Sequence, residues 1–354
     1  MRSAAVALCI ACAAFSLAAR NPPLAREPGP GLLAPGEEKF LANVRQLTFG
    51  GQNAEAYWSA DGERLIFQSD EGRLPCDQIF TMKADGSERR RVSGGGGKTT
   101  CSYFLPAGDR VLYASTIRAG DACPPRPDRT HGYVWPLDDY DIYAARADGS
   151  DVRPLFASPA YDAEATASPD GRSVVFTSAR DGDLEIYSMN ADGSNVRRLT
   201  RTPGYDGGPF FSDDSRKIVY RADHPATPQD LARYRENLSR NAYAPRALEI
   251  RVMNSDGSND RAVTSNGAAN FAPYFLPGGK EIIFSSNLDD PRRREFDLYL
   301  IREDGTGLTR ITFAPEFDGF PMLTRDGRRL VFASNRNGSA PRETNIFVAD
   351  WVRK

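Results

Sequence analysis

Six polar residues recur at one position of a pattern that repeats along the chain, and three of them are carboxylates. Each stands eight residues before the Asp, or its equivalent, of a recurrent turn: Asn53, Thr99, Asp162, Asp206, Asn270 and Asp318. Oxygen atoms that converge on a channel could bind a hard cation such as Ca²⁺, a basic side chain or a partner's N-terminus. In a second interpretation, each residue caps its own turn and ties adjacent units together by hydrogen bonds.

Aromatic and acidic neighbours widen the chemistry available at this position. Tyr161, Tyr205 and Phe317 each precede one of the six residues, and Glu164 stands two positions after Asp162. The aromatic rings could pack between units or form a platform for a sugar or a peptide. We therefore include these four residues in the candidate ligand-binding set.

The elements that must position these residues are short β-hairpins. Each repeating unit contains two hairpins in series, and residues 166–178 and 185–199 are the clearest copies. β-Branched and aromatic residues flank an Asp-Gly pair in both, and the glycine accepts a positive φ. The Asp of the second hairpin returns at positions 85, 148, 192, 256 and 304. Four-stranded units with a period of about 40–50 residues predict a β-propeller.

The first hairpin occurs six times, which predicts an all-β, six-bladed propeller of four-stranded blades. The last blade has only its third strand at NIFVADWVRK (345–354), and VRQLTF (44–49) matches the missing fourth strand. We expect the N-terminal strand to complete the last blade and close the ring over residues 43–354.

Two long insertions, residues 118–139 and 224–246, are expected on the same face as the six polar residues. In the second insertion, Thr227 as N-cap and Pro228 as first helical residue predict a short helix. Long loops on one face of a rigid scaffold usually carry function or cover a pocket.

The repeat SPDGRSVVFTSARDGDLEIYSMNADGSNVRRLT (168–200) resembles the propeller repeats of TolB, the periplasmic protein of bacterial Tol–Pal systems. The resemblance covers roughly residues 43–354. TolB carries a separate α/β domain before its propeller, whereas a short spacer stands there in this chain. The resemblance implies a periplasmic protein with an envelope-associated protein partner.

The first residues look like a secretory signal peptide, which we place at 1–19, followed by a flexible spacer at 20–42. We therefore expect a periplasmic or secreted monomer. Ile10-Ala11-Cys12 loosely resembles a lipoprotein cleavage box, so membrane attachment would depend on lipidation at Cys12. The net charge of −2 gives no reason to expect nucleic acid or an anionic membrane as a partner.

Three cysteines, Cys76, Cys101 and Cys123, remain after removal of the signal peptide. An oxidising compartment favours a disulfide, and we expect Cys76–Cys101, because both residues begin strands in adjacent blades. Cys123 is then left over, or it pairs with Cys101 instead. The spacing of these cysteines and His131 matches no zinc motif, so no metal is expected there.

Sequence motifs of common enzyme classes are missing, so recognition is the preferred function. His131 and His224 are the only histidines, and neither a nucleophile elbow nor a zinc-binding helix is present. We expect a recognition or scaffold module that binds an envelope protein or peptide through the upper face and channel mouth, without a cofactor. A glycan is a further ligand class, and an auxiliary propeller beside a peptidase is a related possibility. The alternative is a carbohydrate-active hydrolase or lyase that uses Asp162, Glu164 and Asp206.

Overall fold

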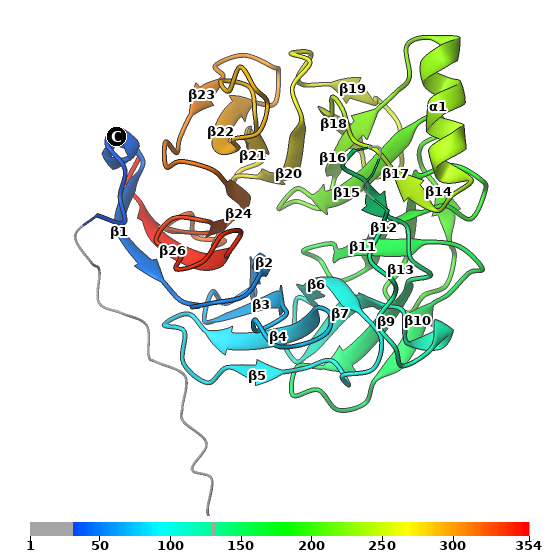
Figure 1. Cartoon of the computed structure of the whole chain (residues 1–354), viewed down its shortest axis with the longest axis horizontal. Coiled ribbons are helices and arrows are strands. Elements are labelled where there is room, and N and C mark those ends of the chain that lie inside the picture. Colours follow the sequence, from blue (N-terminus) through cyan, green and yellow to red (C-terminus); the bar gives the residue numbers. More distant parts are fainter. Residues whose placement is uncertain (1–30, 129, 131, 354) are drawn as a thin grey trace, which may run out of the picture.

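The fold is a ring of six four-stranded antiparallel sheets around a common axis (Figure 1). This computed structural model describes residues 31–353 except 129 and 131. The predicted all-β, six-bladed propeller is therefore confirmed. The expected signal peptide and residues 20–30 of the expected spacer lie outside the described residues.

In blades 1 to 5 the four strands follow one another in chain order, from the axis outward (Figure 1). Blade 1 consists of β2 (Asn53–Trp58), β3 (Arg64–Ser69), β4 (Gln78–Lys83) and β5 (Arg90–Arg91). Blade 2 consists of β6 (Thr99–Phe104), β7 (Arg110–Ser115), β9 (Asp141–Arg146) and β10 (Arg153–Phe156). Blade 3 consists of β11 (Asp162–Ala167), β12 (Ser173–Ser178), β13 (Glu185–Asn190) and β14 (Arg197–Arg198).

Blade 4 consists of β15 (Tyr205–Phe211), β16 (Lys217–Asp223), β18 (Glu249–Asn254) and β19 (Arg261–Ala262). Blade 5 consists of β20 (Asn270–Phe275), β21 (Glu281–Ser286), β22 (Asp297–Arg302) and β23 (Thr309–Arg310). Blade 6 contains β24 (Asp318–Leu323), β25 (Arg329–Ser334) and β26 (Asn345–Trp351), and its outer strand is β1 (Leu41–Gln46).

The N-terminal strand closes the ring, as predicted. β1 pairs antiparallel with β26, with Leu41 opposite Trp351 and Gln46 opposite Phe347. The short helix η1 (Glu37–Lys39) precedes β1, and its Glu37 is fully buried. Glu37 forms an ion pair of 3.0 Å with Arg336 in blade 6. The packing of the propeller therefore extends into the segment expected as a spacer.

The second strand of each blade lies between neighbouring sheets and is apolar on both faces. Val174, Val175 and Phe176 of β12 are all 0% exposed. Each Asp-Gly turn that joins the two outer strands has the same local structure. In blade 3, Asp192 accepts a hydrogen bond of 2.9 Å from the backbone N–H of Ser194, and Gly193 has a φ of 87°.

Both insertions leave the upper ends of the blades and join each other. The first contains η2 (Ile117–Ala119) and β8 (Trp135–Pro136), and the second contains α1 (Pro228–Leu238) and β17 (Ala242–Tyr243). β8 pairs antiparallel with β17, so the two insertions form one small sheet. The predicted helix is confirmed, because Thr227 accepts a hydrogen bond from the Asp230 backbone and Pro228 is its first residue.

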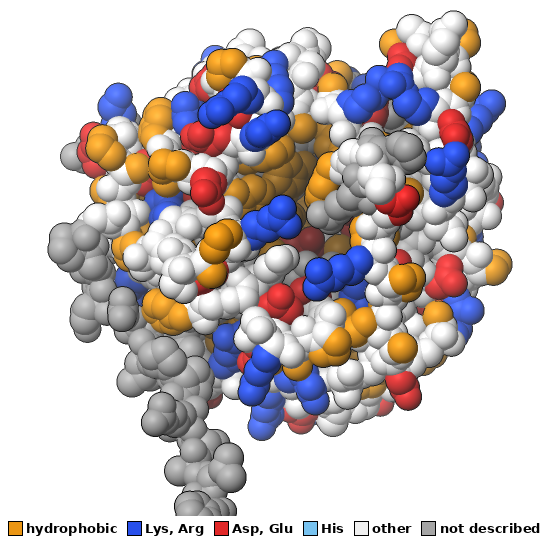
Figure 2. Space-filling model, in the orientation of Figure 1, with side chains coloured by type: hydrophobic (Ala, Val, Ile, Leu, Met, Phe, Trp, Pro, Cys, Tyr) orange, Lys and Arg blue, Asp and Glu red, His pale blue; other side chains and the backbone are white. Residues whose placement is uncertain are grey.

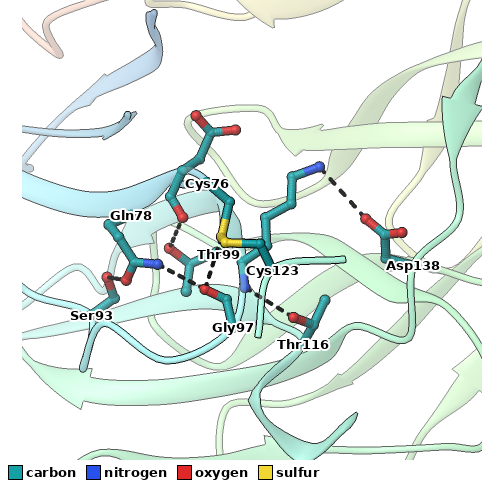
Figure 3. The surroundings of a disulfide bond; sticks show 10 residues. Cys76, Gln78, Ser93, Gly97, Thr99, Thr116, Cys123 and Asp138 are labelled. Carbon is teal, nitrogen blue, oxygen red and sulfur yellow. Dashed lines mark hydrogen bonds and ion pairs between the residues drawn. A yellow bond between two sulfur atoms is a disulfide. The ribbon is translucent and has the colours of Figure 1, made fainter. Parts of the chain in front are cut away.

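The disulfide joins Cys76 to Cys123, so the expected pair Cys76–Cys101 is wrong, as is Cys101–Cys123 (Figure 3). Cys101 is the third residue of an inner strand and carries a free thiol. Cys123 instead reaches Cys76 because the first insertion passes back over blade 1. The disulfide lies near Gly97, whose carbonyl accepts a hydrogen bond of 2.9 Å from Gln78 (Figure 3).

Candidate functional site at the channel mouth

The six predicted ring residues occupy equivalent places, at the start of the innermost strand of each blade. Their relative exposures lie between 0% and 1%, so none of them lies open to solvent: Asn53, Thr99, Asp162, Asp206, Asn270 and Asp318. In every blade the backbone N–H of this residue donates to a carbonyl of the preceding blade. Asp206 donates to Leu184, for example, and Asn53 donates to Thr344 across the ring closure.

Most of these side chains also have protein partners. The side chain of Asn53 donates to Gly50 and Thr344, and Asp318 forms an ion pair of 2.8 Å with Arg336. Asp206 lies 2.9 Å from Nε2 of His224, at the base of the second insertion. The backbone hydrogen bonds of the ring residues therefore join adjacent blades, whereas His224 and Arg336 belong to the same blades as Asp206 and Asp318.

The residues that face the channel stand two positions later. The residue two positions after each ring residue has a left-handed backbone, with φ between 49° and 61°: Glu55, Cys101, Glu164, Gly208, Ala272 and Phe320. The strand register shifts at this point in all six blades, which marks a β-bulge. The bulges turn these six residues toward the axis and make them the wall of the channel.

Rings from opposite blades close the channel beneath this wall. Tyr57 of blade 1 and Phe210 of blade 4 meet with their ring centroids 5.3 Å apart. Tyr103 and Tyr274 each contact Phe210 as well, at 6.0 and 5.8 Å. The candidate site is therefore a blind pit that opens on the insertion face, with an aromatic floor. About 30 Å³ of free space remains at its base, room for one or two water molecules.

One side of the pit is charged. Glu164 forms an ion pair with Arg221 and also accepts hydrogen bonds from Thr177 (2.6 Å) and from the backbone of Gly208 (2.8 Å). The guanidinium of Arg221 also donates to the hydroxyl of Tyr205, 3.0 Å away. Glu164 is thus the one predicted site residue with a carboxylate in the pit, and it bridges blades 3 and 4.

Glu55 is the second carboxylate of the pit. Burial raises the pKa of Glu55 to about 7, and the nearby negative charge of Glu164 adds to the effect. Glu55 has no ion-pair partner among the described residues. Burial also raises the pKa of the Cys101 thiol well above its usual value, so this thiol is not activated as a nucleophile.

The rim of the pit is aromatic. Phe271, Phe296, Phe317 and Phe320 form one cluster above blades 5 and 6, with ring centroids 5.2 to 6.2 Å apart. Figure 2 shows a hollow at the centre of the viewed face, with hydrophobic side chains along its wall. Phe317, predicted as a candidate, belongs to this cluster and is partly exposed, whereas Phe271 is buried.

The remaining predicted aromatic residues pack under the insertions. Tyr205 is buried and stacks on Tyr243 of β17, with ring centroids 4.3 Å apart. Trp135 of β8 lies against both rings and over the guanidinium of Arg221. Tyr161, half-buried, contacts Tyr140 edge-on at 5.9 Å. The joined insertions therefore cover the pit above blades 3 and 4 and leave the phenylalanine side open.

No set of metal ligands is evident in the part of the chain that the structure describes. No group of three or more His, Cys, Asp or Glu side chains there is placed to hold an ion.

Comparison with known proteins identifies the repeats. The family model described as the TolB beta propeller domain matches residues 136–227 and 168–244. The repeats of this chain are therefore TolB-like β-propeller repeats. None of the curated proteins compared matches this TolB-like propeller in sequence.

Solved structures share the fold of the TolB-like propeller at low sequence identity. Putative TolB from Agrobacterium tumefaciens has a TM-score of 0.59 and 19% identity, over 85% of this chain and 91% of that one. TolB from Acinetobacter baumannii has a TM-score of 0.55 and 15% identity, over 75% of this chain and 55% of that one. The gluconolactonase XC5397 from Xanthomonas campestris has a TM-score of 0.57 and 15% identity, over 94% and 96%.

Sequence reasoning missed Glu55, Arg221 and Phe320 in the TolB-like propeller. The alignment of the repeats selected a residue at the start of each inner strand, whereas the pit is built from the residue two positions later. Gly208 was the one available signal for the bulge, because glycine often marks a left-handed backbone within a strand. The other five bulge positions hold residues that do not favour a positive φ.

Proposed function

We propose that this chain is a secreted or periplasmic recognition module that binds a protein or peptide partner of the cell envelope. The partner would dock on the insertion face and place one group in the blind pit. The TolB-like repeats support an envelope scaffold. The described part of the chain contains no helix long and apolar enough to cross a membrane.

The observation that carries this proposal is a partly exposed phenylalanine rim beside the carboxylate of Glu55, which has no ion-pair partner among the described residues. Phe317 and Phe320 stay partly exposed although they belong to an aromatic cluster. Exposed aromatic clusters beside a polar pocket are typical of protein interaction sites. An extended peptide can cover the rim and direct one hydrogen-bond donor or positive group to Glu55.

Selection from a random peptide library tests this function. The protein, residues 31–354, would be immobilised, and selected peptides would then be measured on Glu55→Gln and Phe320→Ala. Alanine can adopt the backbone required at position 320, because Ala272 does so at the equivalent position. We expect each variant to weaken binding about tenfold or more, equal to about 1.4 kcal/mol.

The matched control is Glu63→Gln, an equivalent change at an exposed residue outside the pit. It should leave peptide affinity unchanged. Peptides that bind Glu55→Gln and Phe320→Ala as tightly as the native protein would place the site elsewhere. The same selection with added Ca²⁺ tests whether a cation at the channel mouth takes part.

The second candidate function is hydrolysis or elimination of a carbohydrate. The pit carboxylates, Glu55 and Glu164, are better candidates for this chemistry than the buried carboxylates of Asp162 and Asp206. Burial raises the pKa of Glu55 to about 7, as a general acid requires, while Arg221 pairs with the Glu164 carboxylate. Two carboxyl groups in contrasting surroundings are the usual basis of acid and base roles. Product formation from an oligosaccharide panel that disappears in Glu55→Gln would establish this function in place of recognition.

A further inference from the structure

The blades meet on the lower face, opposite the insertions, and one junction shows how this face holds a carboxylate. At the junction of blades 4 and 5, Glu303 lies between two basic side chains of blade 4. Its carboxylate oxygens form ion pairs of 2.6 Å with Lys217 and 2.6 Å with Arg261. Arg261 also donates to the backbone carbonyl of Glu303 at 2.6 Å. Two cationic side chains of blade 4 thus bind one carboxylate of blade 5.

The junction of blades 1 and 2 repeats the cations without the carboxylate. The strand registers make Arg64 the equivalent of Lys217, and Arg90 the equivalent of Arg261. The residue that follows the third strand of the next blade, Glu303 in blade 5, is Ala147 in blade 2. Its backbone N–H donates to Asp109, as that of Glu303 donates to Lys280, so the two positions correspond.

A groove occupies the place of the missing side chain. It has a volume of about 590 Å³, and Arg64, Arg90 and Ala147 all line it. This volume lies within the range of about 300–1,000 Å³ that is usual for small-molecule sites. Arg64 stacks on Phe104 and donates to the carbonyl of Gly108, contacts that hold its guanidinium at the groove.

The groove keeps a surplus of positive charge. Five basic and three acidic side chains line it: Arg64, Lys83, Arg89, Arg90, Arg146, Glu88, Asp109 and Asp148. Lys83 forms an ion pair with Glu88, and Arg89 turns away to Ser69 and Glu71. Asp148 is held by hydrogen bonds to Ser150.

Arg90 and Arg146 are exposed, and their side chains form no ion pair within 4.0 Å with any residue that the structure describes. Hydrogen bonds from Ser150 lower the pKa of the nearby Asp148 carboxyl, and the positive charges of Arg146 and Arg90 add to this effect. The groove therefore presents two guanidinium groups that are free to bind an anion.

Two other junctions, that of blades 2 and 3 and the ring closure, also have an arginine at the position of Arg64. Each of them contains an aspartate carboxylate. Arg110 of blade 2 pairs with Asp151 at 2.7 Å. At the ring closure, Asp350 stands where blade 1 has Lys83 and accepts a hydrogen bond of 2.6 Å from Asn43. The junction of blades 1 and 2 differs in combining a groove, two uncommitted arginines and an alanine.

We propose that the groove between blades 1 and 2 binds a ligand through a carboxylate group, in the place that the Glu303 side chain fills between blades 4 and 5. Arginine suits this role, because its planar guanidinium forms paired hydrogen bonds with carboxylates. The site lies on the face opposite the pit, so it is independent of the proposed recognition function.

Thermal unfolding with succinate tests the proposal, with uncharged succinamide at equal ionic strength as the control. Succinate should raise the melting temperature of the native protein, because a ligand that binds the folded state alone stabilises it. Ala147→Glu should supply the carboxylate internally and weaken succinate binding about tenfold or more, whereas the neutral Ala147→Gln should keep it.

The reciprocal variant is Glu303→Ala, which should create a second succinate response at the junction of blades 4 and 5. An equal response to succinate in native protein and Ala147→Glu, or an equal response to succinamide, would overturn the proposal. The carboxylate could belong to a free organic acid or to a protein. A peptide with a free C-terminal carboxylate, compared with the same peptide as its amide, distinguishes these two sources. Binding of succinate alone indicates a free organic acid, and binding of both indicates a protein carboxylate.

Discussion

Glu55 and Glu164 lie in one pit, yet their surroundings assign them different roles. Glu164 has four hydrogen-bonding neighbours, including Arg221 and Thr177, and it holds blades 3 and 4 together. Glu55 has Cys101 as its hydrogen-bonding neighbour, and burial dominates its pKa. A ligand therefore gains more from Glu55, because its carboxylate is desolvated without a strong partner in the protein.

This difference predicts that Glu55 lowers stability above neutral pH. Its folded-state pKa of about 7 exceeds the ordinary value of 4.5, so the folded chain binds this proton more tightly than the unfolded chain. Its contribution to stability is full below pH 4.5 and is lost as the pH rises through 7.

Glu55→Gln should be more stable than the native protein by about 1–3 kcal/mol at pH 8, with little difference at pH 4.5. Urea unfolding of both proteins at the two pH values measures this. A variant that is less stable than the native protein at pH 8 would show that the Glu55 carboxylate has a stabilising partner. The exposed Glu63→Gln serves as the control.

At the scale of elements, the sequence predicted the strands and the helix better than it predicted the site. Alternation and Asp-Gly turns depend on neighbours in the chain, so the hairpins and the capped helix at Thr227 could be recognised. The bulge at Glu55 could not, because glutamate does not favour a φ of 51° and adopts it under the constraint of the surrounding blades. Pairing of Cys76 with Cys123 depends on the path of a long insertion, which local pattern does not determine.

The disulfide fixes one end of the first insertion to blade 1, while β8 fixes the other end to β17 of the second insertion. Cys76→Ser with Cys123→Ser should lower the free energy of unfolding by about 2–4 kcal/mol, because the bond closes a long loop in the unfolded chain. Chemical denaturation with and without a reductant measures the effect.

The single variant Cys101→Ser is the matched control for this experiment. It removes a thiol that forms no disulfide, so its response to the reductant should equal that of the native protein. Loss of the reductant effect in Cys101→Ser would contradict the observed pairing.

At the scale of the whole molecule, the ring is held together by repeated contacts between adjacent blades and by one long-range strand pair. At every junction, the ring residue at the start of the inner strand donates a backbone hydrogen bond to the preceding blade. Asn53 makes this bond with Thr344 at the ring closure. The sequence predicted this closure because VRQLTF matches the end of a complete repeat. It could not show that the channel is blind, since Tyr57 and Phe210 meet across the axis from opposite blades.

Removal of β1 should therefore be more damaging than its short length suggests. A protein that begins at residue 48 lacks the partner of β26, and the exposed strand edge should lead to association or loss of a single cooperative unfolding transition. A protein that begins at residue 31 keeps β1 and should remain monomeric. Light scattering and thermal unfolding compare the two, and equal behaviour would show that β1 is dispensable.

The pairing of β1 with β26 also has a consequence for biosynthesis. Ribosomes make β1 before the other strands of the ring, and its hydrogen-bonding partner, residues 345–351, after them. An interrupted translation product can form complete inner blades but cannot close the circle, so it keeps two unpaired edges that chaperones and proteases recognise. The ring can therefore close only after β26 has been synthesised.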